Sequence, residues 1–479
     1  MTCDDTQPAP APLMLSVSGV RGIVGQSITP AVAREFAAAF GSHVRAFSGK
    51  DEPLLCLGRD SRPSGESLAT AALHGLAAVG CRVIDLGVVM TPTVGVMIAK
   101  HHADAGIVIT ASHNPTPWNG LKCLSADGVA PPAHEAARII RRFNDRDIAY
   151  AQTSRTPAPR RDRTGNELHV ARVLAHVDRR PIRAAGFRVV LDSINGAGGT
   201  AGRMLLDELG CETAHINAEP TGVFAHAPEP IEENLRDLAA MTASAGAACG
   251  LAQDPDADRL AIIDETGRYI GEEYTLVLAA KRLLDLHGGG LIAANLSTSR
   301  MIDDLAARYD GAHVTRTPVG EANVVAAMKN PPPSRLPLVG GEGNGGVIWP
   351  QVCWVRDSLS AIALLLSLLA HDRRPLSAIV DELPRYCMIK HRVDLHALGG
   401  RQAVRQGIAN VIAAFRDASH ATVNTADGVR VDWTDGWVHL RPSNTEPIVR
   451  LIAEALTREQ ACELMARIAS IAGLPRPPA

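Results

Sequence analysis

The sequence predicts the α/β fold class: three tandem α/β domains with mixed sheets, followed by a smaller α+β domain. Three observations lead to this prediction. The chain has 479 residues, too many for one hydrophobic core, which suggests three or four domains of about 150 residues each. Segments of strand length alternate with segments of helix length along most of the chain, a pattern typical of parallel strands covered by helices. Past Arg385 this alternation changes to a different mixture of strands and helices.

The composition is typical of a globular enzyme, because 46% of the residues are apolar and only 4% are aromatic. The net charge is −3, with acidic and basic residues interspersed, so no basic surface favours nucleic acid or an anionic membrane as a partner. The first residues, MTCDDTQPAPAP, lack the basic and apolar regions of a signal peptide, and no run reaches the ~18 apolar residues of a membrane span. The nine cysteines contain no C-x-x-C pair, which indicates buried free thiols and no zinc site. We therefore expect a cytoplasmic enzyme.

Domain boundaries are placed where the composition or the order of elements changes. The segment TSRTPAPRRD, residues 153–162, is rich in Pro and Arg and poor in apolar residues. A further unit begins near Tyr269, and the last module begins near Pro384. The predicted parts are a disordered tail (1–12), domain I (13–160), domain II (161–268), domain III (269–384) and domain IV (385–479).

In domain I, Arg21 lies among glycines in LSVSGVRGIVG, so we expect a flexible loop to carry it. Thr29 and Pro30 form an N-cap and the first residue of a helix that continues to Ala46. The next expected elements are strand Leu54–Leu57, helix Ser64–Val79, strand Arg82–Leu86 and a further helical segment. Ligands of such units bind at the carboxyl ends of the strands.

The stretch GIVITASHNP lies at one of these ends. A short apolar strand, Ile107–Ile109, stops abruptly and delivers Ser112 and His113 into a loop closed by Pro115. A hydroxyl at a strand end beside an imidazole could be a nucleophile. The alternative is a Ser/Asn-rich turn that satisfies its own backbone.

The strands and helices of domains II to IV are predicted from the same patterns of apolar and turn residues. Domain II is expected to have strands Arg188–Asp192 and Ala248–Gln253, and a Gly-rich turn, SINGAGG, for which close helix packing is preferred over anion binding. Domain III is expected to have helix Glu272–Leu286, strand Leu291–Asn295, helix Thr298–Tyr309 and strand Leu336–Val339. Domain IV is expected to have helix Gly400–Phe415, strands Val429–Val431 and Trp437–Leu440, and helix Thr457–Ala472.

The acidic segment QDPDADRLAIID carries Asp254, Asp256 and Asp258 at a spacing of two residues. Alternate residues of an extended loop point the same way, so the three carboxylates converge. At ~5 Å and an effective dielectric of ~20, each pair repels by roughly 3 kcal/mol, which a hard divalent cation such as Mg²⁺ would offset. An EF-hand is rejected because its sixth position needs glycine and holds Arg259; a solvated acidic turn is the remaining alternative.

Two further loops combine small residues with polar ones. In GEGNGG, Glu342 and Asn344 alternate with glycines, so the backbone can approach a ligand while two polar side chains bind hydroxyls. In RPSNTEP, an arginine fork and short donors suit a phosphate; these residues are Arg441, Ser443, Asn444 and Thr445. A plain Gly-rich turn and an Asx or Ser turn are the respective alternatives.

ITASHNP, DPDADR, GEGNGG and RPSNTEP occur in this order, one in each predicted domain. Together they resemble the four signature loops of the α-D-phosphohexomutases, and the match covers essentially the whole chain past the tail. The resemblance implies four domains around a central cleft. It also implies that Ser112 is a phosphoserine and that Ser112, Asp254, Asp256 and Asp258 hold Mg²⁺.

The resemblance assigns further roles to residues of the remaining motifs. Glu342 and Asn344 would orient the sugar, and Arg441, Ser443, Asn444 and Thr445 would hold its non-reacting phosphate. Arg21, His113, Lys122 and Arg259 match active-site positions. Many members have histidine where this chain has Gly346, and some have histidine at Glu321, so proton transfer would fall to Lys122, His113 or Glu321. We expect Lys122 to be the general base if cationic neighbours lower its pKa.

The expected activity is that of a phosphosugar mutase, specifically a phosphoglucosamine mutase that converts glucosamine 6-phosphate to glucosamine 1-phosphate through a hexose 1,6-bisphosphate. Cleavage of phosphate monoesters is so slow without catalysis that the site must supply positioning and charge neutralisation. The alternatives are a phosphomannomutase or phosphoglucomutase, a sugar phosphatase, and a non-catalytic metal-binding regulator. The chain is expected to be a monomer or a homodimer.

Overall fold

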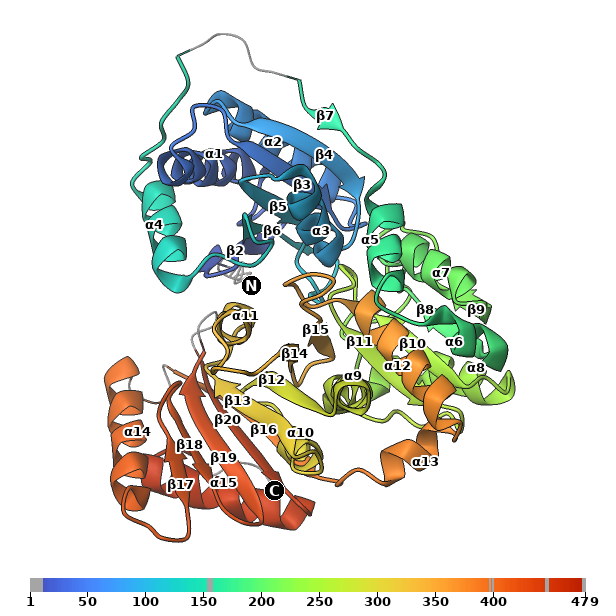
Figure 1. Cartoon of the computed structure of the whole chain (residues 1–479). Helices are drawn as coiled ribbons and strands as arrows, with labels where there is room; N and C mark the ends of the chain where they lie inside the picture. Colours follow the sequence, from blue (N-terminus) through green and yellow to red (C-terminus); the bar gives the residue numbers. More distant parts are fainter. Residues whose placement is uncertain (1–11, 153–157, 396–397, 399, 444–447, 476–479) are drawn as a thin grey trace, which may run out of the picture.

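The computed structural model describes residues 12–152, 158–395, 398, 400–443 and 448–475. Within these residues the chain forms four sheets, which follow one another along an arc from domain I through domains II and III to domain IV (Figure 1). Three sheets are mixed and the fourth is antiparallel, so the predicted fold class is confirmed. Almost all of the predicted tail, residues 1–12, lies outside the described residues.

Domain I has a seven-stranded sheet in the order β1-β2-β6-β5-β3-β4-β7. Its strands are β1 (Met14–Ser16), β2 (Gly19–Ile23), β3 (Leu54–Arg59), β4 (Arg82–Val88), β5 (Ala105–Ile109), β6 (Trp118–Ser125) and β7 (Arg160–Arg161). Its helices are α1 (Pro30–Ser48), α2 (Gly65–Ala78), α3 (Thr91–His101) and α4 (Ala133–Asn144). Thr29 caps α1 as predicted, because its hydroxyl accepts from the backbone N–H of Val32.

Strand β5 lies in the middle of this sheet, parallel to β3 and antiparallel to β6. All five of its residues are buried, as a short continuous apolar strand requires. The carboxyl ends of β3, β4 and β5 therefore lie together, and the loop that carries Ser112 follows β5.

Domain II has a four-stranded sheet in the order β11-β10-β8-β9. Its elements are α5 (Gly165–Leu174), α6 (Arg179–Ala185), β8 (Arg188–Asp192), α7 (Gly199–Glu208), β9 (Glu212–Ile216), the 3-10 helix η1 (Glu232–Asn234), α8 (Arg236–Ser244), β10 (Cys249–Gln253) and β11 (Leu260–Asp264). The glycines of SINGAGG allow close packing: a Cβ at Gly196 would lie 2.7 Å from the carbonyl oxygen of Pro255, and one at Gly198 would lie 2.4 Å from Oε1 of Gln253.

Domain III has a four-stranded sheet in the order β13-β12-β14-β15. Its elements are α9 (Glu272–His287), β12 (Gly289–Asn295), α10 (Met301–Ala306), β13 (Gly311–Thr317), α11 (Glu321–Lys329), β14 (Pro337–Glu342), β15 (Gly346–Ile348), α12 (Ser358–Asp372) and α13 (Leu376–Asp381). Two predicted elements differ: the helix expected over Thr298–Tyr309 is only α10, and β14 extends to Glu342. The extension arises because Glu342 pairs with Gly346, so GEGNGG forms a hairpin turn.

Domain IV has the predicted α+β structure. Its antiparallel sheet has the order β16-β20-β19-β18-β17, and its elements are β16 (Cys387–Asp394), α14 (Arg401–Phe415), β17 (Thr422–Asn424), β18 (Val429–Asp432), β19 (Gly436–Pro442), β20 (Ile448–Ala455) and α15 (Arg458–Ala472). Helix α15 begins with a capping box between Thr457 and Gln460.

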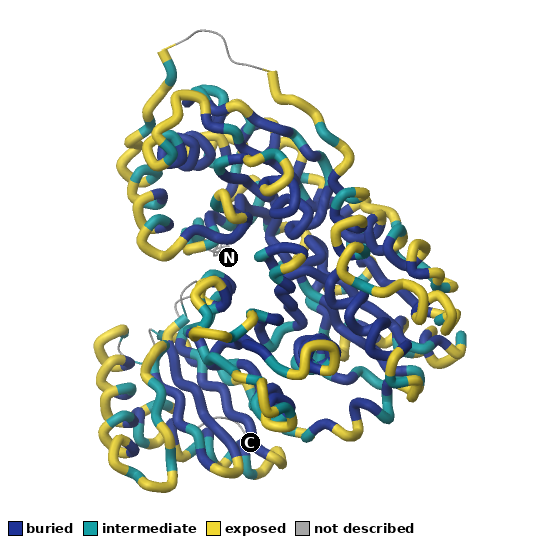
Figure 2. The backbone as a smooth tube through the Cα atoms, viewed as in Figure 1, coloured by how far each residue is buried: buried dark blue, intermediate teal, exposed yellow. Residues whose placement is uncertain are grey.

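The cores of domains II and III are joined through α12, whose first thirteen residues are buried. A helix that is apolar on all sides needs such complete cover. Figure 2 shows buried strands at the centre of each domain and exposed outer helix faces. Eight cysteines are free thiols in the described chain: Cys56, Cys81, Cys123, Cys249 and Cys353 are buried, and Cys211, Cys387 and Cys462 are half-buried. None of the described helices combines the length and hydropathy needed to cross a bilayer.

Candidate functional site

Ser112 follows β5 in a left-handed backbone conformation, with a φ of 51° that is unfavourable for a residue with a Cβ. The conformation is held locally, because the backbone N–H of Ser112 donates to Oγ1 of Thr110 over 2.9 Å. The buried hydroxyl donates to Oδ2 of Asp254 over 3.0 Å, and Nδ1 of His113 lies 3.3 Å from the same Oγ. The serine of domain I thus faces the acidic loop of domain II.

A buried ion pair at the end of β3 shapes the serine loop. Nε of Arg62 donates to Asp60 over 3.1 Å, and the Nη atoms of Arg62 donate to four carbonyl oxygens of the loop and of β6, those of Ser112, Asn114, Pro115 and Trp118. Thr110 also donates to Asp60. Burial raises the pKa of Asp60 to about 6, although Arg62 opposes this shift. Arg62 therefore fixes the backbone that presents Ser112.

The acidic loop connects β10 to β11, and all three of its aspartates are fully buried. Asp254 accepts from Ser112 and from the backbone N–H of Arg259, and Asp256 accepts from the hydroxyl of Thr91 over 2.6 Å. Burial, together with Asp256 and Asp258, raises the pKa of Asp254 well above its usual value. The neighbouring carboxylates thus add to the cost that burial imposes on ionising Asp254.

The residues present suit a divalent cation. One oxygen of each of Asp254, Asp256 and Asp258 lies within 4.8 Å of the others. Oδ1 of Asp256 and Oδ1 of Asp258 are buried without a hydrogen-bond donor, an arrangement that is costly unless a cation occupies the site. An all-oxygen donor set is the one that Mg²⁺ prefers. The predicted metal ligands therefore come together, with Ser112 beside them.

Cationic side chains surround the triad. Nζ of Lys122, on β6, lies 3.0 Å from Asp258 and 4.0 Å from Asp256. Arg21 lies on β2, next to β6, and not on the flexible loop that we expected, because β2 pairs along its whole length with β6. Arg259, burial and Arg21 lower the pKa of His113 to about 2, so this imidazole is neutral.

The expectation that cationic neighbours lower the pKa of Lys122 is wrong. Burial would lower this pKa, but the carboxylates of Asp258, Asp256 and Glu321 outweigh it and raise the pKa above its usual value. Lys122 is thus an ammonium group within an acidic cluster, and this charge state does not suit a general base.

The GEGNGG turn, residues 341–346, is called the sugar loop below. It lies beside the acidic triad, and one arginine contacts both. Arg356, which precedes α12, is buried, and its guanidinium lies 2.7 Å from Asp258, 2.8 Å from Glu342 and 2.9 Å from Glu321. Glu342 also accepts from Nδ2 of Asn295 over 3.0 Å. Oδ1 of Asn344 is buried without a donor, so the loop retains an open acceptor.

Domain IV adds Arg441, whose Nε donates to Asp427 over 2.8 Å. Asp427 also accepts from the backbone N–H of Val319, two residues before Glu321, so this arginine lies against domain III. Ser443 is half-buried at the end of β19, and the predicted phosphate-binding residues Asn444 and Thr445 lie outside the described residues.

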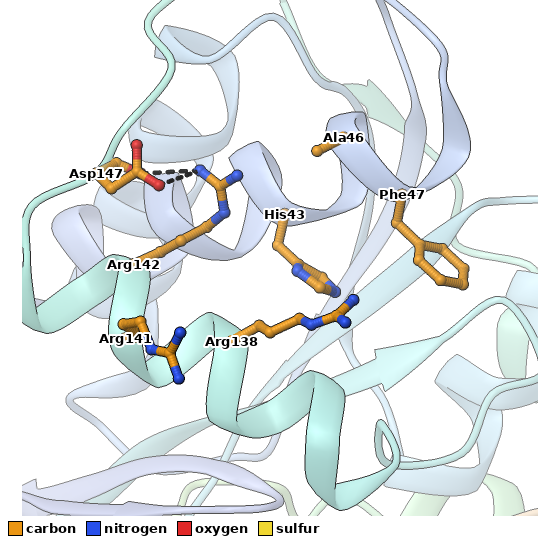
Figure 3. Close-up of a pocket in the computed structure, with 7 residues that line it drawn as sticks. All are labelled: His43, Ala46, Phe47, Arg138, Arg141, Arg142 and Asp147. Carbon is orange, nitrogen blue, oxygen red and sulfur yellow. Dashed lines mark hydrogen bonds and ion pairs between the residues drawn. The ribbon is translucent and has the colours of Figure 1, made fainter.

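A pocket of about 300 Å³ lies between α1 and α4 and is lined by His43, Phe47 and the arginines of α4 (Figure 3). Arg142 is neutralised there by Asp147, at 2.8 Å. None of the motif residues lines this pocket, and it brings together neither a carboxylate cluster nor a hydroxyl nucleophile. The candidate site is therefore the one between domains I, II and III.

Three residues of the site were not predicted from the sequence: Arg62, Thr91 and Arg356. Arg62 and Thr91 follow the strands β3 and β4, so the rule that ligands bind at the carboxyl ends of parallel strands could have found them. No pattern in the sequence distinguishes Arg356.

A serine hydroxyl directed at a buried acidic triad, in three α/β domains and an α+β domain, is typical of a class of phosphoryl-transfer enzymes. Four family models match the chain. They describe the phosphoglucomutase/phosphomannomutase α/β/α domains I, II and III and the C-terminal domain, over residues 14–149, 167–267, 271–386 and 396–471. The chain therefore belongs to the phosphoglucomutase/phosphomannomutase family, and it is a phosphohexomutase, an isomerase that transfers phosphate within a sugar.

Individual relatives agree with this assignment. A phosphoglucomutase/phosphomannomutase of Thermococcus kodakarensis is 38% identical over 448 residues, which cover 93% of this chain and 95% of the relative. A probable phosphoglucosamine mutase of Methanopyrus kandleri is 36% identical over 448 residues, with the same coverage. The crystal structure of a family protein from Burkholderia thailandensis matches with a TM-score of 0.83 at 27% identity, covering 97% of this chain and 98% of that one.

Proposed function

We propose that this chain is a phosphoglucosamine mutase, which converts glucosamine 6-phosphate to glucosamine 1-phosphate through a phosphoserine at Ser112 and a hexose 1,6-bisphosphate. The observation that carries the mechanism is the contact of 3.0 Å between Oγ of Ser112 and Asp254. The hydroxyl is buried beside the acidic triad, on a residue whose backbone is in an unfavourable conformation. Phosphoryl transfer there needs positioning and charge neutralisation more than a strong base.

Asp254, Asp256 and Asp258 would hold Mg²⁺ together with an oxygen on Ser112. When bound, Mg²⁺ neutralises part of the charge on the phosphoryl group. Arg259 and Arg21 add positive charge near the triad, and His113, which is neutral, lies against Ser112. Lys122 remains protonated and stabilises charge as an ammonium group, in place of the base that the sequence suggested.

The sugar would lie between the triad and domain III. Glu342 and Glu321 would accept from its hydroxyls, and Asn344 offers a further acceptor, because its Oδ1 has no donor. Arg441, Ser443, Asn444 and Thr445 would hold the phosphate that is not reacting. Since the bisphosphate must present each end in turn, this last group of residues must accept either end of the sugar.

The choice of glucosamine is supported by the name of the Methanopyrus relative, whereas the name of the Thermococcus relative favours glucose or mannose as a second candidate. The test is turnover of the purified protein on the 1-phosphates of glucosamine, glucose and mannose with Mg²⁺. We expect the highest kcat/KM with glucosamine 1-phosphate. A higher kcat/KM for glucose 1-phosphate or mannose 1-phosphate would contradict the proposed substrate but not the mutase mechanism. Release of free phosphate without isomerisation would overturn both the substrate and the mechanism.

A further inference from the structure

Gly346 and Glu321 both contact one side chain, that of Arg356. A Cβ added at Gly346 would lie 2.2 Å from Cδ and 2.9 Å from Cγ of Arg356. Any side chain at position 346 would therefore displace Arg356 from its present path. Glu321 lies 2.9 Å from Nε of the same arginine. Arg356 therefore requires a small residue at position 346 and meets an opposite charge at position 321.

Arg356 connects the acidic triad to the sugar loop. Nη2 donates to Oδ2 of Asp258 in domain II, and Nη1 donates to Oε2 of Glu342 in domain III. Asp258 lies 98 residues from Arg356 in sequence, whereas Glu342 is only 14 residues away. A planar guanidinium can serve several carboxylates at fixed angles, which the single ammonium of a lysine cannot.

These contacts fix the carboxylate of Glu342. Its Oε1 accepts from Asn295 and its Oε2 accepts from Arg356, so both the plane and the rotamer of the carboxylate are determined. Each carboxylate oxygen can accept a second hydrogen bond, and the directions of these free lone pairs of Glu342 are fixed as well. Glu321 is held on one side only, since its Oε1 is buried without a donor in the described chain.

We infer that Arg356 is a positioning residue for the sugar: it orients Glu342 and Glu321 so that their remaining lone pairs accept the hydroxyls of the hexose, and Gly346 is required to leave room for it. The inference rests on the proposed function, because it assigns the sugar to these two carboxylates. It predicts an effect on binding of the sugar that exceeds the effect on the chemical step.

The test compares Arg356→Gln, Arg356→Lys, Gly346→Ala and the double variant Gly346→Ala/Arg356→Gln with the wild type. The matched control is Arg282→Gln, since Arg282 is similarly buried in domain III but bonds to Ser367 and to no carboxylate of the site. Steady-state kinetics give kcat and KM for the sugar 1-phosphates. Calorimetry with the same sugars in the presence of a chelator gives binding without turnover.

We expect Arg356→Gln to raise KM and the calorimetric Kd by roughly tenfold or more, with a smaller loss of kcat. Arg356→Lys should recover part of the affinity, and Arg282→Gln should leave KM and Kd unchanged. Gly346→Ala should weaken binding to a similar extent, and it should add little to Arg356→Gln, because the guanidinium that it displaces is then already absent.

Unchanged KM and Kd in Arg356→Gln would overturn the inference, and so would effects of the two single variants that multiply in the double variant. A wild type that binds the sugar phosphates but converts none of them would overturn the proposed function only, and the Kd series would still decide the role of Arg356. A wild type that binds none of them would overturn both.

Discussion

The hydroxyl of Ser112 and the carboxylate of Asp254 are 3.0 Å apart although 142 residues separate them in sequence. The contact crosses from domain I to domain II and joins the end of β5 to the loop between β10 and β11. It brings the proposed nucleophile beside the proposed Mg²⁺ site, and phosphoryl transfer needs both.

Ser112→Ala should abolish turnover, by at least about 10³-fold, because no hydroxyl remains to carry the phosphoryl group. Intact mass spectrometry should show a phosphorylated species in the wild type and none in the variant after incubation with a hexose bisphosphate. Ser125→Ala is the matched control, since Ser125 ends β6 in the same domain and its hydroxyl donates to the carbonyl oxygen of Val129. Phosphorylation that persists in Ser112→Ala would refute the assignment.

Asp256→Asn should weaken Mg²⁺ binding and activity while the protein stays folded. The amide can still accept from Thr91, and the change removes one of three carboxylates whose oxygens lie within 4.8 Å of one another, where each pair repels by roughly 3 kcal/mol. We expect the thermal midpoint without metal to stay the same or rise. Calorimetry with Mg²⁺ measures the affinity, with the exposed Asp237→Asn as control. Wild-type turnover that a chelator does not reduce would contradict this prediction.

Arg62→Met should lower the free energy of unfolding by about 3–5 kcal/mol, because it leaves the buried carboxylate of Asp60 unpaired. It should also slow phosphorylation of Ser112, since the loop carbonyls lose their donors. Asp60→Asn/Arg62→Met should recover part of the stability but not the rate. Urea unfolding and a phosphorylation time course separate the two effects. Arg180→Met is the control, because Arg180 forms an exposed ion pair with Asp178. A loss of stability in Arg62→Met no larger than in this control would count against a structural role for the buried pair of Asp60 and Arg62.

Acid should loosen the contact between domains III and IV through His439. Its Nδ1 lies 2.9 Å from Oγ of Ser297 and its Nε2 lies 2.7 Å from the carbonyl oxygen of Asp427, and burial lowers its pKa from 6.5 to about 4. Because the folded pKa is the lower one, the unfolded chain binds more protons between these values. The stability contributed by the neutral ring is complete above pH 6.5 and falls towards pH 4, by on the order of 3 kcal/mol.

The comparison with His439→Gln isolates this effect, because every other titrating group is common to both proteins. The free energy of unfolding, measured by urea between pH 7.5 and about 4.5, should fall less steeply with acid in the variant. Parallel pH profiles for the two proteins would exclude His439 as the source.

Local patterns in the sequence predicted the alternation of strands and helices and the candidate site residues. Strand β5 could be predicted because a short apolar run must be covered on both sides, and the three aspartates could be predicted because residues at a spacing of two share one face. Ser112 and Glu342 were singled out only by the four motifs taken together, because each loop by itself is equally compatible with an ordinary turn.

Only the tertiary structure decided the charge state of Lys122 and the roles of Arg62 and Arg356. The carboxylate beside Lys122 is Asp258, 136 residues away, and the partners of Arg356 come from domain II as well as from its own domain III. The pKa of a buried group and the bonds of a buried arginine depend on which segments pack against each other. That packing is a property of the assembled domains, and no short stretch of the chain contains it.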